Sequence, residues 1–99
     1  MDASLVSEAL VVWTGWGSAA RPVRDEALLV DRFGSEEAAD LFPTIRELED
    51  EFYGSEARFT EPSLKAMGDA AALEFRAAHP ELSEDAIQAL AWCYTYDYK

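Results

Sequence analysis

Residues 82–99, LSEDAIQALAWCYTYDYK, decide the fold of this chain. Ser83 is well suited to cap a helix, and the two acidic residues that follow it favour the positive end of the helix dipole. Between residues 86 and 94, only Gln88 is polar. A helix that is apolar on nearly all sides must be covered by other elements, so we expect this segment to be the central helix of the fold.

The length and composition of the chain point to one small domain. A chain of 99 residues is expected to bury about 65% of the surface that its unfolded form exposes. Hydrophobic residues make up 49% of it, which suffices for a core without disulfides. The only cysteine, Cys93, lies among apolar neighbours and should be a small buried side chain, not a reactive thiol. We therefore expect residues 1–99 to form a single helical domain.

The sequence predicts neither export nor a membrane span. The apolar run at residues 5–13 has no basic lead-in and no small-residue cleavage pattern, so we expect no signal peptide. No apolar run approaches the roughly 18 residues that a transmembrane helix needs. A lone cysteine also suits a reducing compartment, and we expect a cytoplasmic location.

Negative charge is the strongest global feature of the chain. Twenty acidic and eight basic residues give a formal net charge of −12. Such a chain repels phosphate groups, so we expect no direct binding to nucleic acid or to a membrane surface. It is attracted to basic surfaces instead. The alternative interpretation is that the acidity only keeps a small protein in solution.

The first predicted helix covers residues 3–14. Leu5, Ala9 and Val12 recur at helical spacing, Asp2 or Ser4 can cap the start, and a glycine follows the end. The run at residues 10–14 would suit a strand equally well. Because the chain offers no second strand to pair with it, we favour the helix.

The second predicted helix covers residues 23–33 and is followed by Gly34 as a C-terminal cap. Its apolar side is expected to consist of Val23, Ala27 and Val30, with Leu29 and Phe33 beside them.

The third helical segment, residues 36–53, contains a proline. Its apolar residues recur at spacings of four, three and four, and they are Leu41, Ile45, Leu48 and Phe52. This stripe crosses Pro43, and a proline costs a helix interior about 3 kcal/mol. The chain can kink there, or it can form a short helix over 36–41 and a new helix from Pro43. We favour the break, because Thr44 and Glu47 would form a capping box for the new helix.

The next helix is predicted to follow Thr60 as its N-cap and to end at His79, before a proline. Gly68 and Ala71 are small and lie on its apolar face, so another helix can approach closely there. A short turn then leads to the C-terminal segment, and these two helices should pack as an antiparallel hairpin. The predicted fold is all-α, a compact bundle of about five helices, or six if Pro43 breaks the third.

The sequence contains no motif for catalysis, for a cofactor or for a metal ion. His79 is the only histidine, and a general base or zinc ligand needs partners that it lacks. Glu47 and Glu51 lie one turn apart, but calcium takes about six to eight oxygen ligands. Glycine-rich phosphate loops and nucleophile motifs are missing. We therefore expect no enzyme activity, no cofactor and no metal site.

The third helical segment is also the most acidic part of the chain, with seven acids against Arg46 between residues 36 and 51. A solvated helix face is the ordinary interpretation of such a run. The alternative is a docking patch, since like charges one turn apart destabilise a helix and a cationic partner would relieve them. The candidate partner-binding residues are Glu36, Glu37, Asp40, Glu47, Glu49, Asp50, Glu51 and Tyr53.

Aromatic residues alternate along the end of the chain, at Trp92, Tyr94, Tyr96 and Tyr98. In a helix Tyr94 and Tyr98 would be neighbours, whereas in an extended segment all four rings would line one side. The sequence leaves both conformations open for residues 94–99. The rings either cover a small core or form an interface, and an interface would allow a homodimer.

The leading functional hypothesis is a small acidic module that binds another protein with a basic surface. Small acidic inhibitors, such as immunity proteins and antitoxins, share its size and charge, although no motif carries that likeness. A self-associating structural or accessory subunit is the alternative hypothesis. A small helical ligand-binding protein or enzyme is the third.

Overall fold

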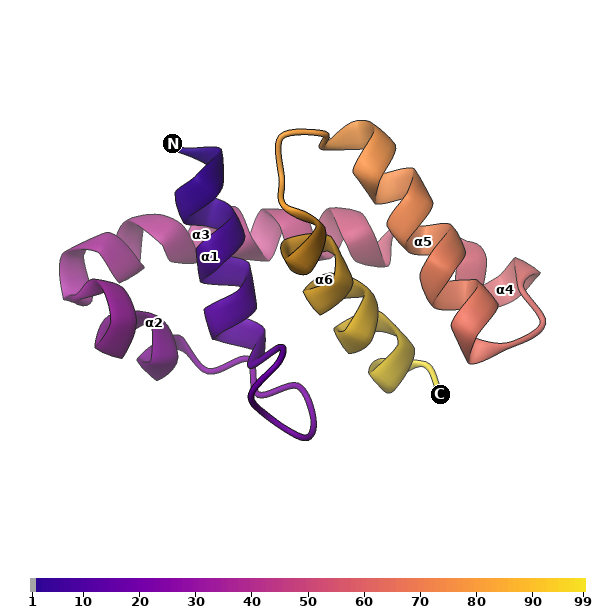
Figure 1. Cartoon of the computed structure of the whole chain (residues 1–99), viewed down its shortest axis with the longest axis horizontal. Coiled ribbons are helices and arrows are strands. Elements are labelled where there is room, and N and C mark those ends of the chain that lie inside the picture. Colours follow the sequence, from indigo (N-terminus) through magenta and orange to yellow (C-terminus); the bar gives the residue numbers. More distant parts are fainter. Residues whose placement is uncertain (1) are drawn as a thin grey trace.

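The computed structural model describes residues 2–99, and these residues form helices and loops without a strand (Figure 1). The helices are α1 (Ala3–Thr14), α2 (Glu26–Phe33), α3 (Ser35–Tyr53), α4 (Ala57–Thr60), α5 (Leu64–Ala78) and α6 (Glu84–Asp97). The predicted all-α bundle of about five helices is confirmed, since α4 is only a single turn. No helix of residues 2–99 has both the length and the apolar character needed to cross a membrane.

Helix α6 packs against three other helices, α1, α3 and α5. In Figure 1 it lies between α1 and α5, with α3 passing behind. Its Ile87, Leu90 and Tyr94 side chains are buried in the shared core. The Tyr94 hydroxyl donates to the Ser55 carbonyl and accepts from the Arg58 amide, so this deeply buried polar group is satisfied.

Helices α5 and α6 form the predicted antiparallel hairpin (Figure 1). The predicted close approach at Gly68 is also present, because a Cβ added there would lie 2.8 Å from Cγ2 of Thr95. The start of α5 differs from the prediction. Ser63, not Thr60, caps α5 by accepting from the Ala66 amide, since Thr60 belongs to the separate turn α4.

Helix α1 has the predicted bounds, with Asp2 as N-cap and a left-handed Gly15 as C-cap. Its buried side shares only Ala9 with the predicted one. Val6, Leu10 and Trp13 are buried, whereas Leu5 and Val12 are only partly covered. The helix contacts α2, α3 and α6, and these contacts, not the spacing of apolar residues, select the covered side.

Helix α2 is shorter than predicted and starts at Glu26, capped by Asp25. The reason is the backbone of Arg24, whose φ of 55° lies in the left-handed region and cannot belong to an α-helix. Val23 therefore lies outside the helix and is 46% exposed. The predicted apolar side was wrong for Val23, Ala27 and Val30, which are exposed. Leu29 and Phe33, predicted beside them, are the residues of α2 that are buried and partly buried.

Helix α3 runs unbroken through Pro43, which corrects the predicted break at that residue. Pro43 is exposed, while Leu41, Ile45 and Phe52 on the other side of the helix are buried. The carbonyl that loses its hydrogen bond to proline therefore faces solvent, where water can bond it. Burial of one long apolar stripe then outweighs the cost of the proline.

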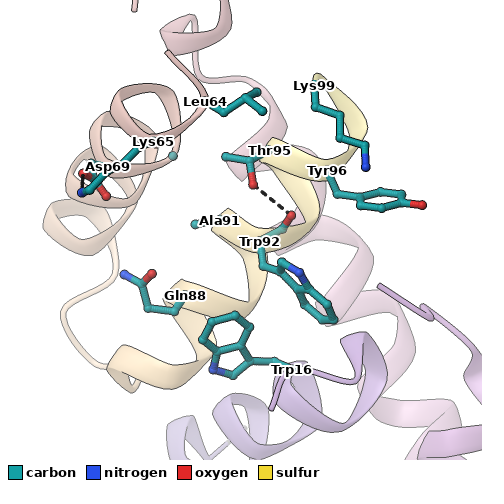
Figure 2. A pocket seen from close by; sticks show the side chains of 11 residues that line it. Trp16, Leu64, Lys65, Asp69, Gln88, Ala91, Trp92, Thr95, Tyr96 and Lys99 are labelled. Carbon is teal, nitrogen blue, oxygen red and sulfur yellow. Dashed lines mark hydrogen bonds and ion pairs between the residues drawn. The ribbon is translucent and has the colours of Figure 1, made fainter. Parts of the chain in front are cut away.

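The chain stays helical to Asp97, which settles the alternatives for most of the C-terminal segment. The rings of Tyr94 and Tyr98 are neighbours, with centroids 5.1 Å apart, as a helix requires. Trp92 lies beside Trp16, and Tyr96 lies beside Lys99 (Figure 2).

Candidate functional site

Five carboxylates occupy the solvent side of α3, and we call them the acidic face: Glu36, Asp40, Glu47, Asp50 and Glu51. Each residue turns a helix by about 100°, so these spacings keep all five within roughly a third of the circumference. The opposite side of α3 carries its buried apolar residues. Burial of that stripe against α1, α2 and α6 therefore holds the carboxylates outward.

Four members of the acidic face have no cationic partner. Glu36, Asp40, Glu47 and Asp50 make no ion pair and no side-chain hydrogen bond with any residue from 2 to 99. Arg46 is the only base on α3, and it pairs at 3.9 Å with Glu49 on the flank of the helix. The charge of the face is thus left to solvent and to any partner.

The fifth member, Glu51, is paired with His79 at the C-terminal end of α5. Nε2 of the imidazole contacts Glu51, and Nδ1 lies 3.2 Å from Glu81. Partial burial alone would lower the pKa of His79, but the two carboxylates outweigh it and the pKa is raised. His79 therefore fastens α5 to α3. Its ring also packs on Phe75, with centroids 4.6 Å apart.

Three predicted site residues lie off this face. Glu37 is half-buried at its edge. Glu49 is turned toward the core, with a side chain only 16% exposed and one carboxylate oxygen buried without a hydrogen-bond partner in residues 2–99. Burial raises the pKa of Glu49, against the opposing effect of nearby arginines. Tyr53 is half-buried, and its hydroxyl donates to Asp97.

Asp97 is the centre of a polar cluster that sequence analysis missed. Arg24 donates to both of its carboxylate oxygens, at 2.5 and 3.0 Å, and also contacts the Tyr53 hydroxyl. Partial burial would raise the pKa of Asp97, but these donors outweigh it and the pKa is lowered. The cluster ties the loop after α1 to α3 and α6. Arg24 and Asp97 are 73 positions apart, so no local pattern could have paired them.

A second surface feature is an open groove of about 390 Å³ between α5, α6 and the loop after α1. We call it the aromatic groove, because the rings of Trp16, Trp92 and Tyr96 line it (Figure 2). The two indoles are in contact, with ring centroids 5.5 Å apart. Gly68 and Ala91 also line it, and their small size leaves the space between the two helices open.

No protein-family model, curated protein or solved structure matches this chain. Functional inference therefore depends on its own surfaces. In residues 2–99, no three His, Cys, Asp or Glu side chains are grouped so that they could hold a metal ion. Cys93 is fully buried, and burial raises the pKa of its thiol to about 12, so it is not a nucleophile at neutral pH.

Proposed function

We propose that this chain works by binding another protein through the acidic face of α3, and that this partner presents a basic surface. The supporting observation is the set of four exposed carboxylates, at Glu36, Asp40, Glu47 and Asp50, that no cation of residues 2–99 neutralises. Like charges one turn apart cost a helix about 0.2–0.5 kcal/mol per pair. These four side chains make no hydrogen bond or ion pair within residues 2–99, whereas a cationic partner could form ion pairs with several of them.

Electrostatic attraction would act mainly on the rate of encounter. Complementary charge raises association rate constants well above those of neutral pairs, and rim charges contribute most to this effect. The Debye length is about 8 Å at physiological ionic strength, so the attraction should weaken strongly as salt is added. An inhibitor that covers the basic site of a cytoplasmic protein is the function that this behaviour suits best.

The experiment compares two variants of equal net charge. The face variant carries Glu36→Gln, Asp40→Asn, Glu47→Gln and Asp50→Asn, and Glu51 is kept because it pairs with His79. The control carries four neutralised acids that are exposed on α2 and around α4: Glu26→Gln, Asp31→Asn, Glu56→Gln and Glu61→Gln. Glu26 and Glu36 both occupy first turns of helices, so the helix-dipole contribution is matched.

Immobilised wild-type chain and both variants are used to capture proteins at low and high salt, and each captured protein is then purified and titrated. A partner that binds wild type and control alike, loses at least ~10-fold in affinity for the face variant and weakens with salt supports the proposal. Equal losses for the two variants would show that only net charge matters. That result, or binding indifferent to salt, or no partner under any condition, would overturn the proposal.

A further inference from the structure

We propose that the aromatic groove binds a small organic anion with an apolar body, such as an aromatic or aliphatic carboxylate. This inference does not depend on the acidic face. Helix α3 contacts the rings of α6 at Tyr94 and Tyr98, and neither residue lines the groove. The aromatic groove and the helix that carries the acidic face therefore lie on different sides of α6.

The shape of the groove suits a small apolar body. Its volume of about 390 Å³ falls within the usual range of small-molecule sites, roughly 300–1,000 Å³. Trp16, Trp92 and Leu64 supply its walls, and Leu64 is 44% exposed although it is fully apolar. A flat ring or a short alkyl chain laid across these side chains would remove apolar surface from water on both sides of the contact.

The charge of the groove selects the sign of the ligand. Both lysines of the chain, Lys65 and Lys99, line it, against the single acid Asp69. Lys65 is paired with Asp69 at 2.7 Å. Lys99 has no carboxylate partner in residues 2–99, and its ammonium lies 4.2 Å from the ring centroid of Tyr96. The side chains that line the groove thus carry one net positive charge beside apolar walls, although the chain as a whole carries −12.

Two other polar groups of the groove are already engaged. The Thr95 hydroxyl donates to the Trp92 carbonyl at 3.2 Å, and the Gln88 amide donates to Glu84 at 2.9 Å (Figure 2). The indole N–H groups of Trp16 and Trp92 make no hydrogen bond within residues 2–99, so they can donate to an anionic group of a ligand. The Lys99 ammonium, unlike that of Lys65, has no side-chain carboxylate partner in residues 2–99 and can pair with an anionic group of the ligand. A ligand with one anionic group on an apolar body therefore fits the groove best.

The test uses the indole N–H signals in a proton–nitrogen correlation spectrum. The chain has three tryptophans, of which Trp16 and Trp92 line the groove and Trp13 is 4% exposed in the core. Naphthylacetate is titrated against naphthylethylammonium, which has the same ring system and the opposite charge. We expect naphthylacetate to shift the two groove signals saturably, to leave the Trp13 signal in place and to bind more tightly than the cation.

Two charge variants complete the test. Lys65→Met with Lys99→Met should weaken naphthylacetate ~3-fold or more, as expected for loss of exposed charge partners. The control, Arg32→Gln with Arg46→Gln, removes two exposed charges of other helices and should leave affinity unchanged. Tighter binding of the cation, equal weakening in both variants, movement of all three indole signals together, or no saturable shift would each overturn the proposal.

Discussion

Replacement of Gly68 by alanine is expected to disturb the contact between α5 and α6 at one point. Gly68 lies in the interior of α5, where an added Cβ would stand 2.8 Å from Cγ2 of Thr95. Carbon atoms at rest are about 3.5–4.0 Å apart, so either the Thr95 side chain or the helix itself must move. The other neighbours of Gly68 leave room for the methyl group. The effect of Gly68→Ala should therefore depend on one methyl group of Thr95.

Two opposing contributions set the size of this effect. Alanine is favoured over glycine in a helix interior by about 1 kcal/mol. Overpacking a close contact typically costs about 1–3 kcal/mol. We therefore expect Gly68→Ala to lower the free energy of unfolding by about 0–2 kcal/mol. For a domain of this size, 1 kcal/mol corresponds to about 4–8 °C in Tm.

A double-mutant cycle with Thr95→Ser isolates the contact, because serine lacks Cγ2 but keeps the hydroxyl that donates to Trp92. In the Thr95→Ser background, Gly68→Ala should stabilise the chain by about 1 kcal/mol. The coupling energy between the two positions should thus be about 1–3 kcal/mol. The assay is urea unfolding followed by helical circular dichroism for all four proteins. If Gly68→Ala stabilises both backgrounds equally, the close approach inferred here does not exist.

Two further predictions concern the faces of α3 and α5. Pro43→Ala should stabilise the chain by about 1–3 kcal/mol, since an exposed position in an unbroken helix regains a backbone hydrogen bond; destabilisation in urea unfolding would contradict this account of α3. His79 has a raised pKa, so its ion pairs stabilise the fold fully below the unfolded pKa near 6.5, and this contribution is lost as pH rises through the higher folded value. Unfolding is measured from below pH 6.5 to above the folded pKa of His79. The free energy of unfolding should fall with pH in wild type and not in His79→Gln. An equal dependence on pH in both proteins would rule out the ion pairs of His79 with Glu51 and Glu81.

The two proposed surfaces can be separated experimentally because they share no residue. The acidic face lies on α3, and the aromatic groove lies on α5, α6 and the loop after α1. Neutralising the face should leave the indole shifts with naphthylacetate unchanged. Neutralising the lysines should likewise leave capture of a basic partner unchanged.

The sequence predicted those features that depend on neighbours along the chain. The cap at Ser83, the helix end at Gly15 and the antiparallel hairpin all appeared as expected, and Asp2 is the one of the two candidate caps of α1 that the structure uses. Capping and turn formation involve residues within a few positions of one another, so a local pattern is sufficient to identify them. The acidic run was visible for the same reason, since five of its carboxylates follow the helical period.

The errors arose where distant contacts outweighed local preference. Pro43 should locally end a helix, yet burial of one stripe against three other helices keeps α3 continuous. By local preference Arg24 would belong to α2. Its side chain bonds to Asp97 and its backbone is left-handed, so α2 begins only at Glu26. Glu49 belongs to the acidic run by sequence, but its position on α3 turns it toward the core.

The sequence by itself thus determined the helical class, the helix ends marked by local caps and the concentration of negative charge on one segment. Tertiary structure alone decided which sides of α1 and α2 are covered, that Glu49 is turned toward the core, and that Trp16, Trp92 and both lysines meet around one groove. The physical reason is the separation along the chain over which each kind of interaction acts. A cap or a helical period acts over a few residues, whereas burial and ion pairing depend on segments that only folding brings together.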